Sequence, residues 1–427
     1  MIRNYITQAL TMMRQQKLYT AIYTGATAIS LALAMTLFIV FHTRYSPAYP
    51  EYSRERIISV EVIKVNSFKG GGYINYTGPN YLPDDFIPLI KDIDGIKNIS
   101  RYCYSDVKSM IVNDEEIGFQ PMCVDDNYWK IFDFEFIAGA PFGEKELYDA
   151  KAVITESVAK EMFARTDVVG ENILVNNKQP CTIVGVVKDA HDCMYYTSKK
   201  IFFPRYFEYR SNDNDDIELF GSNMLYIEAE KISAMENIKK EIKERYARYI
   251  NEKIQHNNYE EYNYTMYIYS HWQQAFNSSC DDTVWELFKN YFYIILAFLF
   301  IPAPNLSGMI YSRMNSRLCE IGVRKAYGAT NAQILWQILC ENLFLTFIGA
   351  LAGLVLSYIL AYYTTDDILA IIFGYKSEYE YPAEHLFSPR IFTITLLLCF
   401  VLNIASSLLP AMLALRKNIV QSLYNKR

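Results

Sequence analysis

"CEIGVRKAYGATNAQILWQ", Cys319–Gln337, is a polar stretch between two strongly apolar segments of the chain. It combines charged residues with glycines, namely Glu320, Gly322, Arg324, Lys325 and Gly328. Each glycine marks a point where the chain can bend or where another backbone can come close. A stretch this short cannot form a domain, so we expect one short helix, a glycine turn and the start of a long apolar helix.

The apolar residues gather in four segments, 20–41, 287–311, 335–363 and 389–415. About 20 apolar residues in a helix cross a hydrocarbon layer of ~30 Å, so we predict four membrane spans. Two prolines interrupt the second segment, which leaves a buried core helix as its alternative. The first segment is longer than the ~7–15 residues typical of a signal-peptide core, which favours an uncleaved anchor over a signal peptide.

Lysine and arginine set the predicted orientation, because cytoplasmic loops carry an excess of them. Basic residues precede the first span, fill the loop 312–334 and dominate the tail 416–427, whereas the loop 364–388 is acidic. Both termini and the loop 312–334 are therefore predicted to be cytoplasmic. The acidic loop and the large segment 42–286 are predicted to lie outside.

The segment 42–286 holds 27 basic and 40 acidic residues, so its net charge is −13 where the whole chain has −6. This charge argues against nucleic acid or anionic lipid as its ligand. It contains five cysteines, an odd number at irregular spacing that is no disulfide framework but allows one or two bridges.

Strand and helix signals alternate irregularly along 42–286, which predicts an α+β domain in two lobes. Alternating β-branched runs predict strands at Arg56–Val65, Cys181–Asp189, Asn223–Glu230 and Tyr264–Ser270. The residues "ENILVNN" before Cys181 predict its hairpin partner. Helical spacing predicts helices at Val153–Phe163, with Thr155 as cap, and at Lys231–Ile254.

The first residues, 1–19, place apolar side chains at helical spacing from Ile2 to Met13. This predicts a cytoplasmic amphipathic helix on the inner membrane surface, with membrane lipid as its partner, or a helix packed on a partner protein.

Motifs for catalysis or cofactor binding are not found in the sequence. There is no phosphate-binding loop, no H-E-x-x-H and no G-x-S-x-G. The neighbours His191, Asp192 and Cys193 favour a polar loop over a metal site, and Gly70–Gly72 favours a surface loop. We therefore predict no enzyme activity, no catalytic residue, no metal and no cofactor.

The order of residues in "RLCEIGVRKAYGATNAQILWQILCENL" closely resembles the cytoplasmic loop of FtsX/MacB-type permeases of ABC transporters. Their pattern E-I-G-[IV]-[RK]-[KR]-A-x-G-A-[ST] is filled in order from Glu320 to Thr330. Three outer stretches, "VDDNYWKIFDFEFIAGAPF", "AVITESVAKEMF" and "CTIVGVVKDA", look like the MacB-type periplasmic core domain in the same order. The resemblance covers nearly the whole chain, which however lacks the fused ATPase of MacB.

The resemblance implies a permease subunit in the cell (inner) membrane that works with a separately encoded ABC ATPase, as a homodimer or a heterodimer with a related permease. The loop then serves as a coupling helix that docks on the ATPase through Glu320, Gly322, Arg324, Lys325, Gly328 and Ala329. ATP-driven motion reaches the outer domain and exports or extracts substrate, with a periplasmic adaptor or outer-membrane protein as a further partner. The alternative is an FtsX-like transmitter that activates cell-wall hydrolases and transports nothing.

Small residues in the third span repeat every four positions, at Gly349, Gly353, Ser357 and Ala361. They form a ridge on one helix face that lets another helix approach closely, either within the chain or across a dimer.

Overall fold

This computed structural model describes residues 17–69, 72–80, 82–104, 110–112, 115–117, 121–175, 179–207, 223–257, 261–276, 318–373 and 389–415, with a few isolated positions besides. The predicted N-terminal helix, the second span and the tail 416–427 lie wholly or almost wholly outside these residues. The chain divides into two compact units. The first comprises Met1–Thr43, Val284–Gly374 and Glu380–Arg427, and the second comprises Arg44–Thr283 and Tyr375–Tyr379.

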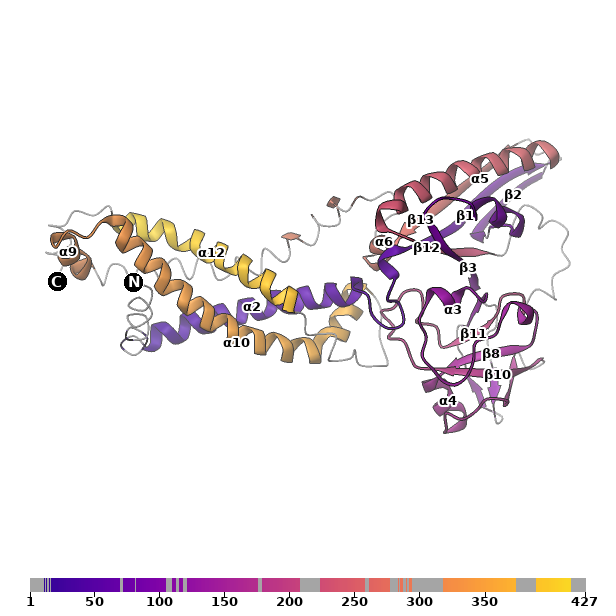
Figure 1. The fold of residues 1–427 in the computed structure, drawn as a ribbon, viewed down its shortest axis with the longest axis horizontal. Coiled ribbons are helices and arrows are strands. Elements are labelled where there is room, and N and C mark those ends of the chain that lie inside the picture. The colour runs from indigo at the N-terminus through magenta and orange to yellow at the C-terminus, as the bar shows by residue number, and fades with distance from the viewer. Residues whose placement is uncertain are drawn as a thin grey trace. The chain divides into compact units, whose positions relative to one another are not determined.

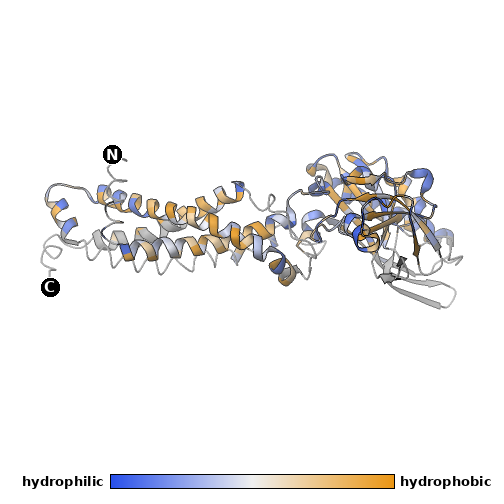
Figure 2. Ribbon diagram, turned by 90° about the horizontal axis from the view of Figure 1, so that it is seen from below, coloured by the Kyte–Doolittle hydropathy of each residue, from blue (hydrophilic) through white to orange (hydrophobic). Residues whose placement is uncertain are grey.

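The first unit is helical (Figure 1). Its described helices are α2 (Lys17–Tyr45), whose last residues belong to the second unit, and α9 (Leu318–Ala326), α10 (Asn331–Phe373) and α12 (Pro389–Leu415). Two described stretches, Lys17–Tyr45 and Asn331–Ile371, are long and apolar enough to cross a membrane. Figure 2 shows α2 and α10 as mainly hydrophobic ribbons. The number of four spans stays a prediction.

Helix α10 continues past Tyr363, where the sequence predicted the third span to end, as far as Phe373. Thr364 and Thr365 do not break it, because each hydroxyl donates to the carbonyl oxygen four residues earlier, at 2.7 and 2.6 Å. The predicted external loop 364–388 therefore begins inside a helix.

The second unit, called the outer unit below, is built on one sheet whose hydrogen-bonded order is β13-β1-β12-β3-β6-β11-β8-β10-β9-β4-β5, with β2 on β1 and β7 on β10. Most strand pairs are antiparallel, but β10 is parallel to β8 and β11 is parallel to β6. The strands are β1 (Ile57–Lys69), β2 (Gly72–Asn80), β3 (Ile96–Tyr104), β4 (Met110–Val112), β5 (Glu115–Ile117), β6 (Met122–Val124), β7 (Phe136–Gly139), β8 (Lys151–Thr155), β9 (Asn172–Val175), β10 (Gln179–Val187), β11 (Ile201–Pro204), β12 (Met224–Ala229) and β13 (Glu261–Ser270).

Helices are inserted between these strands (Figure 1). The α-helices of the outer unit are α3 (Tyr128–Ile131), α4 (Glu156–Phe163), α5 (Met235–Asn257) and α6 (His271–Ala275), and its short 3-10 turns include η1 (Arg54–Arg56), η2 (Asp84–Ile90), η3 (Glu144–Glu146) and η6 (Ile232–Ala234).

Successive side chains of each strand point to opposite faces of the sheet, and the buried residues of the outer unit form three clusters. Helix α5 packs on β1 and β12, and we call this part, with β13 and β3, the α5 lobe. Helix α4 packs on β8, β10 and β11, and we call this part, with β6 and β9, the α4 lobe. Residues of opposite parity, such as Tyr102, Val124 and Phe202, form a third, aromatic cluster that draws on strands of both lobes. Strand pair β3–β6 joins the lobes.

Most predicted elements of the outer unit appear in the structure, including the pairing of β9 with β10 and the long helix now seen as η6 and α5. The predicted helix Val153–Phe163 is wrong in its first part, because Val153 and Ile154 belong to strand β8 and α4 begins at Glu156. Val153 and Ile154 are fully buried partners of β10, and sheet pairing overrides the helical spacing. Thr155 occupies the N-cap position, but its side chain makes no capping hydrogen bond.

Candidate functional site

The segment 318–331 consists of helix α9, a tight turn and the start of α10. Gly328 has φ +91°, a left-handed conformation that glycine adopts without strain. The Gly328 and Ala329 amides donate to the carbonyl oxygens of Lys325 and Arg324, both at 3.0 Å. This pair of bonds is a Schellman motif, which ends α9. Thr330 then caps α10, since its hydroxyl accepts from the Gln333 amide (3.3 Å) while Gln333 Oε1 accepts from the Thr330 amide (3.0 Å).

Arg324 is held by its own chain. Its guanidinium donates to Glu320 Oε1 on the preceding turn of α9, at 2.6 Å, and also to the Gln337 side chain on α10. Gln337 in turn donates to Glu341 Oε1 at 2.9 Å, and both of these α10 side chains are buried. Within the chain, Arg324 thus fixes α9 against α10.

One side of α9 packs into the helical unit. Ile321 is buried in a cluster with Tyr23 of α2 and with Ile334 and Ile338 of α10, and Ala329 packs against the same cluster. Gly322 is also buried, whereas Lys325 is half-buried. The helix is therefore seated by apolar contacts as well as by Arg324.

The opposite side of α9 is exposed. Val323 of α9 and Tyr327, the residue directly after α9, are four positions apart and so on one face, because the Tyr327 amide still donates to the Val323 carbonyl oxygen at 3.1 Å. They are 46% and 89% exposed, and Trp336 near the start of α10 is 60% exposed. Single exposed apolar side chains are common on proteins, but apolar side chains that share one exposed face can serve as a contact for a partner or for lipid. We call Val323 and Tyr327 the exposed face of α9.

The small residues of α10 lie against α2. A Cβ added at Gly349 would be 3.0 Å from the Thr24 carbonyl oxygen, and one at Gly353 would be 2.8 Å from the Ala28 carbonyl oxygen. Ser357 and Ala361 are fully buried. Of the two arrangements left open for the ridge, the structure shows a contact within the chain.

A buried charged cluster, not anticipated from the sequence, lies where α2 reaches the outer unit. Arg44 donates to the carbonyl oxygens of Ala275 (2.8 Å) and Cys193 (2.6 Å). Arg54 donates to the Tyr45 carbonyl oxygen at 3.1 Å, and Arg54 Nη1 lies 3.7 Å from Glu51 Oε2.

These side chains hold together segments that are distant in the sequence. Glu51 Oε1 accepts from the Tyr196 amide (2.8 Å) and the Thr197 hydroxyl (2.9 Å). Arg44, Glu51 and Arg54 are at most 1% exposed. Because Arg44 also binds Ala275, the cluster connects the two ends of the outer unit. In the sequence, the sign of this cluster was a charged residue directly after an apolar span.

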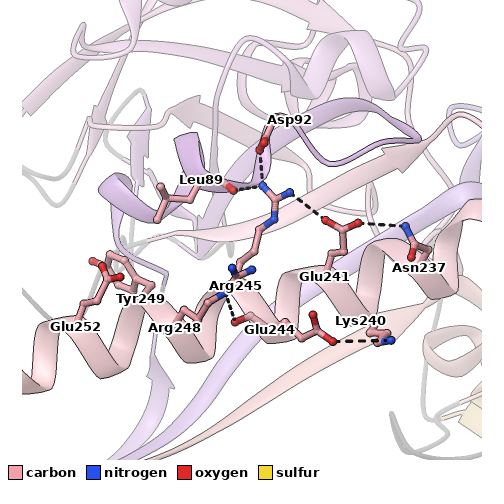
Figure 3. A pocket seen from close by; sticks show the side chains of 10 residues that line it. All are labelled: Leu89, Asp92, Asn237, Lys240, Glu241, Glu244, Arg245, Arg248, Tyr249 and Glu252. Carbon is pink, nitrogen blue, oxygen red and sulfur yellow. Dashed lines mark hydrogen bonds and ion pairs between the residues drawn. The ribbon is translucent and has the colours of Figure 1, made fainter.

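A surface groove runs along α5 and is lined by charged side chains of both signs (Figure 3). Arg245 donates to the Leu89 carbonyl oxygen (2.6 Å), to Glu241 (3.0 Å) and to Asp92, whose pKa it lowers. Lys240 lies 3.9 Å from Glu244. The charges neutralise one another along the helix, as on a solvent-facing surface, and do not converge on a common point.

Among the described residues, no group of three or more histidine, cysteine, aspartate or glutamate side chains could hold a metal ion. His191 Nδ1 accepts a hydrogen bond from the Cys193 amide at 3.1 Å, which makes it part of the loop's own structure.

Family models match nearly the whole chain. The MacB-like periplasmic core domain matches residues 20–245, and the FtsX-like permease C-terminal domain matches residues 286–419. The chain is 24% identical over 291 residues to an uncharacterised ABC transporter permease, YknZ, of Bacillus subtilis (strain 168), covering 66% of this chain and 67% of YknZ. It is 24% identical over 314 residues to the macrolide export ATP-binding/permease protein MacB 1 of Yersinia pestis, covering 72% of this chain but only 44% of that longer protein.

Similar solved structures include the extracellular domain of YknZ, with a TM-score of 0.34, 16% identity and coverage of 48% of this chain and 99% of that one. A domain of a putative permease protein from Porphyromonas gingivalis gives a TM-score of 0.39 at 16% identity, covering 57% of this chain and 98% of that one. The two family models, of which the first alone matches more than half of the chain, identify it as a member of the FtsX/MacB family of ABC transporter permeases that carries a MacB-like periplasmic core domain.

Proposed function

We propose that this chain couples ATP hydrolysis by a separately encoded ABC ATPase to movement of its extracytoplasmic domain, and that this movement exports or extracts substrate. In this proposal helix α9 docks on the ATPase, and the outer unit is the part that moves. Both ends of the outer unit's chain meet at the buried charged cluster. Both termini and α9 are cytoplasmic in this proposal, and the outer unit is outside.

The observation that carries the proposal is the exposed face of α9. A helix of nine residues is too short to be stable on its own, so the position of α9 depends on Ile321, on Arg324 and on the turn at Gly328. With these contacts made inside the chain, Val323 and Tyr327 are left at the surface. A preformed helix whose outward side chains are apolar and aromatic suits a partner groove, since it loses little conformational freedom on binding.

This geometry changes which substitutions test docking. A bulky residue at Gly328 would disrupt the Schellman turn, and a charge reversal at Arg324 would release α9 from Gln337. Loss of ATPase binding in either variant would therefore not locate the contact. Val323 and Tyr327 can be replaced with less effect on the chain's own packing, because both are exposed.

The test is co-purification with the ATPase from cells that produce it. The double variant Val323→Asp with Tyr327→Asp should reach the membrane and melt like the parent, yet retain at least about tenfold less ATPase, because two apolar contacts in an interface commonly contribute more than ~1.4 kcal/mol. The matched control is Ile232→Asp in the outer unit, an apolar residue that is 58% exposed and should leave binding unchanged. Full ATPase binding and stimulation in the double variant would overturn the proposal.

A further inference from the structure

Two cysteines face each other across the strand pair that joins the lobes of the outer unit. In the antiparallel register of β3 and β6, Cys103 is the Cα partner of Cys123. Directly opposed residues of such a pair project to the same face of the sheet. Both side chains accordingly contribute to the core that α4 covers, Cys123 as a buried member and Cys103 as a partly buried neighbour. The two thiols are thus side by side on one face.

The hydrogen bonds of this strand pair define the spacing. The Asp125 amide donates to the carbonyl oxygen of Arg101, its opposite residue, at 3.1 Å, so this position is of the hydrogen-bonded type. The two types alternate along an antiparallel pair, which makes Cys103 and Cys123 a hydrogen-bonded pair with a Cα separation of about 5.5 Å. Disulfides have Cα separations of about 4.4–6.8 Å, most often near 5.5–6 Å. The Cα separation therefore lies within the disulfide range. In the structure both side chains are free thiols, and the Cβ atoms of a hydrogen-bonded pair, about 5.5 Å apart, must approach to about 4 Å for the bond to form.

Cys181 is too distant to compete with this pairing. It lies in the same core on β10, which is separated from β6 by β11 and β8. With strands about 4.8 Å apart, Cys181 is roughly 14 Å from Cys123. Among the described cysteines in strands of the outer unit, Cys103 and Cys123 are thus the pair whose backbones lie closest.

Access and local charge favour Cys103 as the sulfur that reacts first. Cys103 is only half-buried, whereas Cys123 is 1% exposed. Arg205 Nη1 donates to Cys103 Sγ at 3.2 Å. A partly exposed sulfur beside a cationic group is the usual setting of a cysteine that undergoes thiol–disulfide exchange.

We propose that Cys103 and Cys123 form a disulfide in the mature protein, with a disulfide-bearing thiol oxidant of the outer compartment as electron acceptor. The Cys103 thiolate attacks one sulfur of the oxidant disulfide and expels the other as a thiol. The Cys123 thiolate then attacks Cys103 Sγ in the mixed disulfide and expels the second thiol. The two protons and two electrons of the cysteine thiols end on the two oxidant thiols.

The bond would lock the two lobes together. Strands β3 and β6 share a register of three residue pairs, and Cys103–Cys123 is the middle one. A covalent link there fixes β3 of the α5 lobe to β6 of the α4 lobe, so that a force applied to one lobe reaches the other without the short ladder opening. The inference depends on the proposed outer placement of this unit, where disulfides persist, and not on docking of an ATPase.

The direct test is non-reducing peptide mapping of the full chain. Membranes from producing cells are treated at once with an alkylating reagent to trap thiols, and the purified chain is digested without reductant. A linked peptide that joins Cys103 to Cys123 is expected. Both residues recovered in alkylated form, or either one linked to Cys181, Cys193 or Cys280, would overturn the proposal.

A second experiment distinguishes two reasons why the bond could be missing, namely a wrong spacing of the two cysteines or a wrong placement of the outer unit relative to the membrane. The purified full chain is incubated with oxidised glutathione and mapped again. If the bridge forms here but is absent from cells, the backbone spacing is right and the outer placement is at fault, which also counts against the proposed function. If it forms in neither arm, the fault lies in the geometry alone and the proposed function stands.

Thermal melting supplies an independent measurement. Reduction should lower the melting temperature of the parent by roughly 5–10 °C, because the bond closes a loop from residue 103 to residue 123. The matched control is the double variant Cys103→Ser with Cys123→Ser, whose melting should not respond to the reductant. An equal response of parent and variant would contradict the proposal.

Discussion

His271 is a single side chain whose protonation is linked to the stability of the outer unit. Its Nε2 lies 3.1 Å from the Tyr45 carbonyl oxygen, which can only accept, so the neutral ring carries its proton on Nε2. Burial lowers the pKa of His271 well below its usual 6.5, and the charges of Arg54 and Arg44 lower it further against the opposing effect of that hydrogen bond.

The sign of the pH effect follows from this shift. Below about pH 6.5 the unfolded chain binds a proton at His271 that the folded chain does not, so this residue's contribution is fully present above that pH and is lost as the pH falls. The limiting slope is about 1.4 kcal/mol per pH unit. Burial raises the pKa of the neighbouring Glu51, which acts in the opposite sense, so the effect of His271 must be measured as a difference.

We predict that His271→Gln makes the unfolding of the outer unit less sensitive to acid. Glutamine keeps a donor for the Tyr45 carbonyl oxygen but cannot be protonated. Denaturant unfolding of parent and variant between about pH 5 and 8 should show stability curves that converge toward low pH. Curves that stay parallel over this range would mean that His271 does not take up a proton on unfolding.

Residue roles in the segment Glu320–Thr330 were only partly predictable from the sequence. The glycine turn could be predicted, because Gly328 follows a helical run and precedes a cap. The partners of Arg324 could not, because its bond to Gln337 depends on the angle between α9 and α10. The sequence near residue 324 shows the two basic residues Arg324 and Lys325 but not the residues of the same chain that Arg324 contacts.

At the scale of elements, helix α10 is packed on α2 through backbone contact at its glycines. Replacement of Gly353 by alanine would place Cβ 2.8 Å from the Ala28 carbonyl oxygen, and backbone atoms cannot move aside as a side chain can. We predict a loss of about 1–3 kcal/mol, the usual cost of overpacking, seen as a lower melting temperature of the full chain in detergent.

Gly25 on α2 supplies the matched control, because a Cβ added there would meet nothing within 4 Å. Gly25→Ala should therefore melt at or slightly above the parent, given alanine's higher helix propensity. Equal melting of Gly353→Ala and Gly25→Ala would show that the two helices do not pack closely at this ridge.

The limits of sequence reasoning are also visible in single elements. Helix α5 was predictable because its charged face repeats over many turns, whereas "AVITESVAKEMF" combines the end of β8 with α4 in one amphipathic run. Val153 satisfies both a helical and a strand period, and the decision rests on β10, which lies later in the sequence. Nonlocal pairing of this kind could not be read from periodicity.

At the scale of the whole molecule, the uneven distribution of apolar and charged residues predicted a membrane unit and a separate outer unit. Long apolar segments are stable in lipid, whereas a segment rich in charged residues is stable in water. The order of strands across the sheet could not be predicted, since β3 pairs with β12 and β6, neither of which is next to it in the chain. The same limit applies to the buried cluster of Arg44, Glu51 and Arg54, which depends on that topology.

The proposed division of labour makes one prediction for the intact complex. If α9 docks on a separate ATPase, Tyr327 must touch that ATPase in the membrane of the living cell. Tyr148 of the outer unit, which is 55% exposed, must not, because the proposal places it on the other side of the membrane.

Site-specific photo-crosslinking in cells that produce the ATPase tests this directly, with a photoreactive amino acid at position 327 and, as the matched control, at position 148. The account predicts an adduct of this chain with an ABC ATPase from position 327 and none from position 148. An adduct from position 148, or none from position 327 in a complex that still co-purifies with the ATPase, would contradict it.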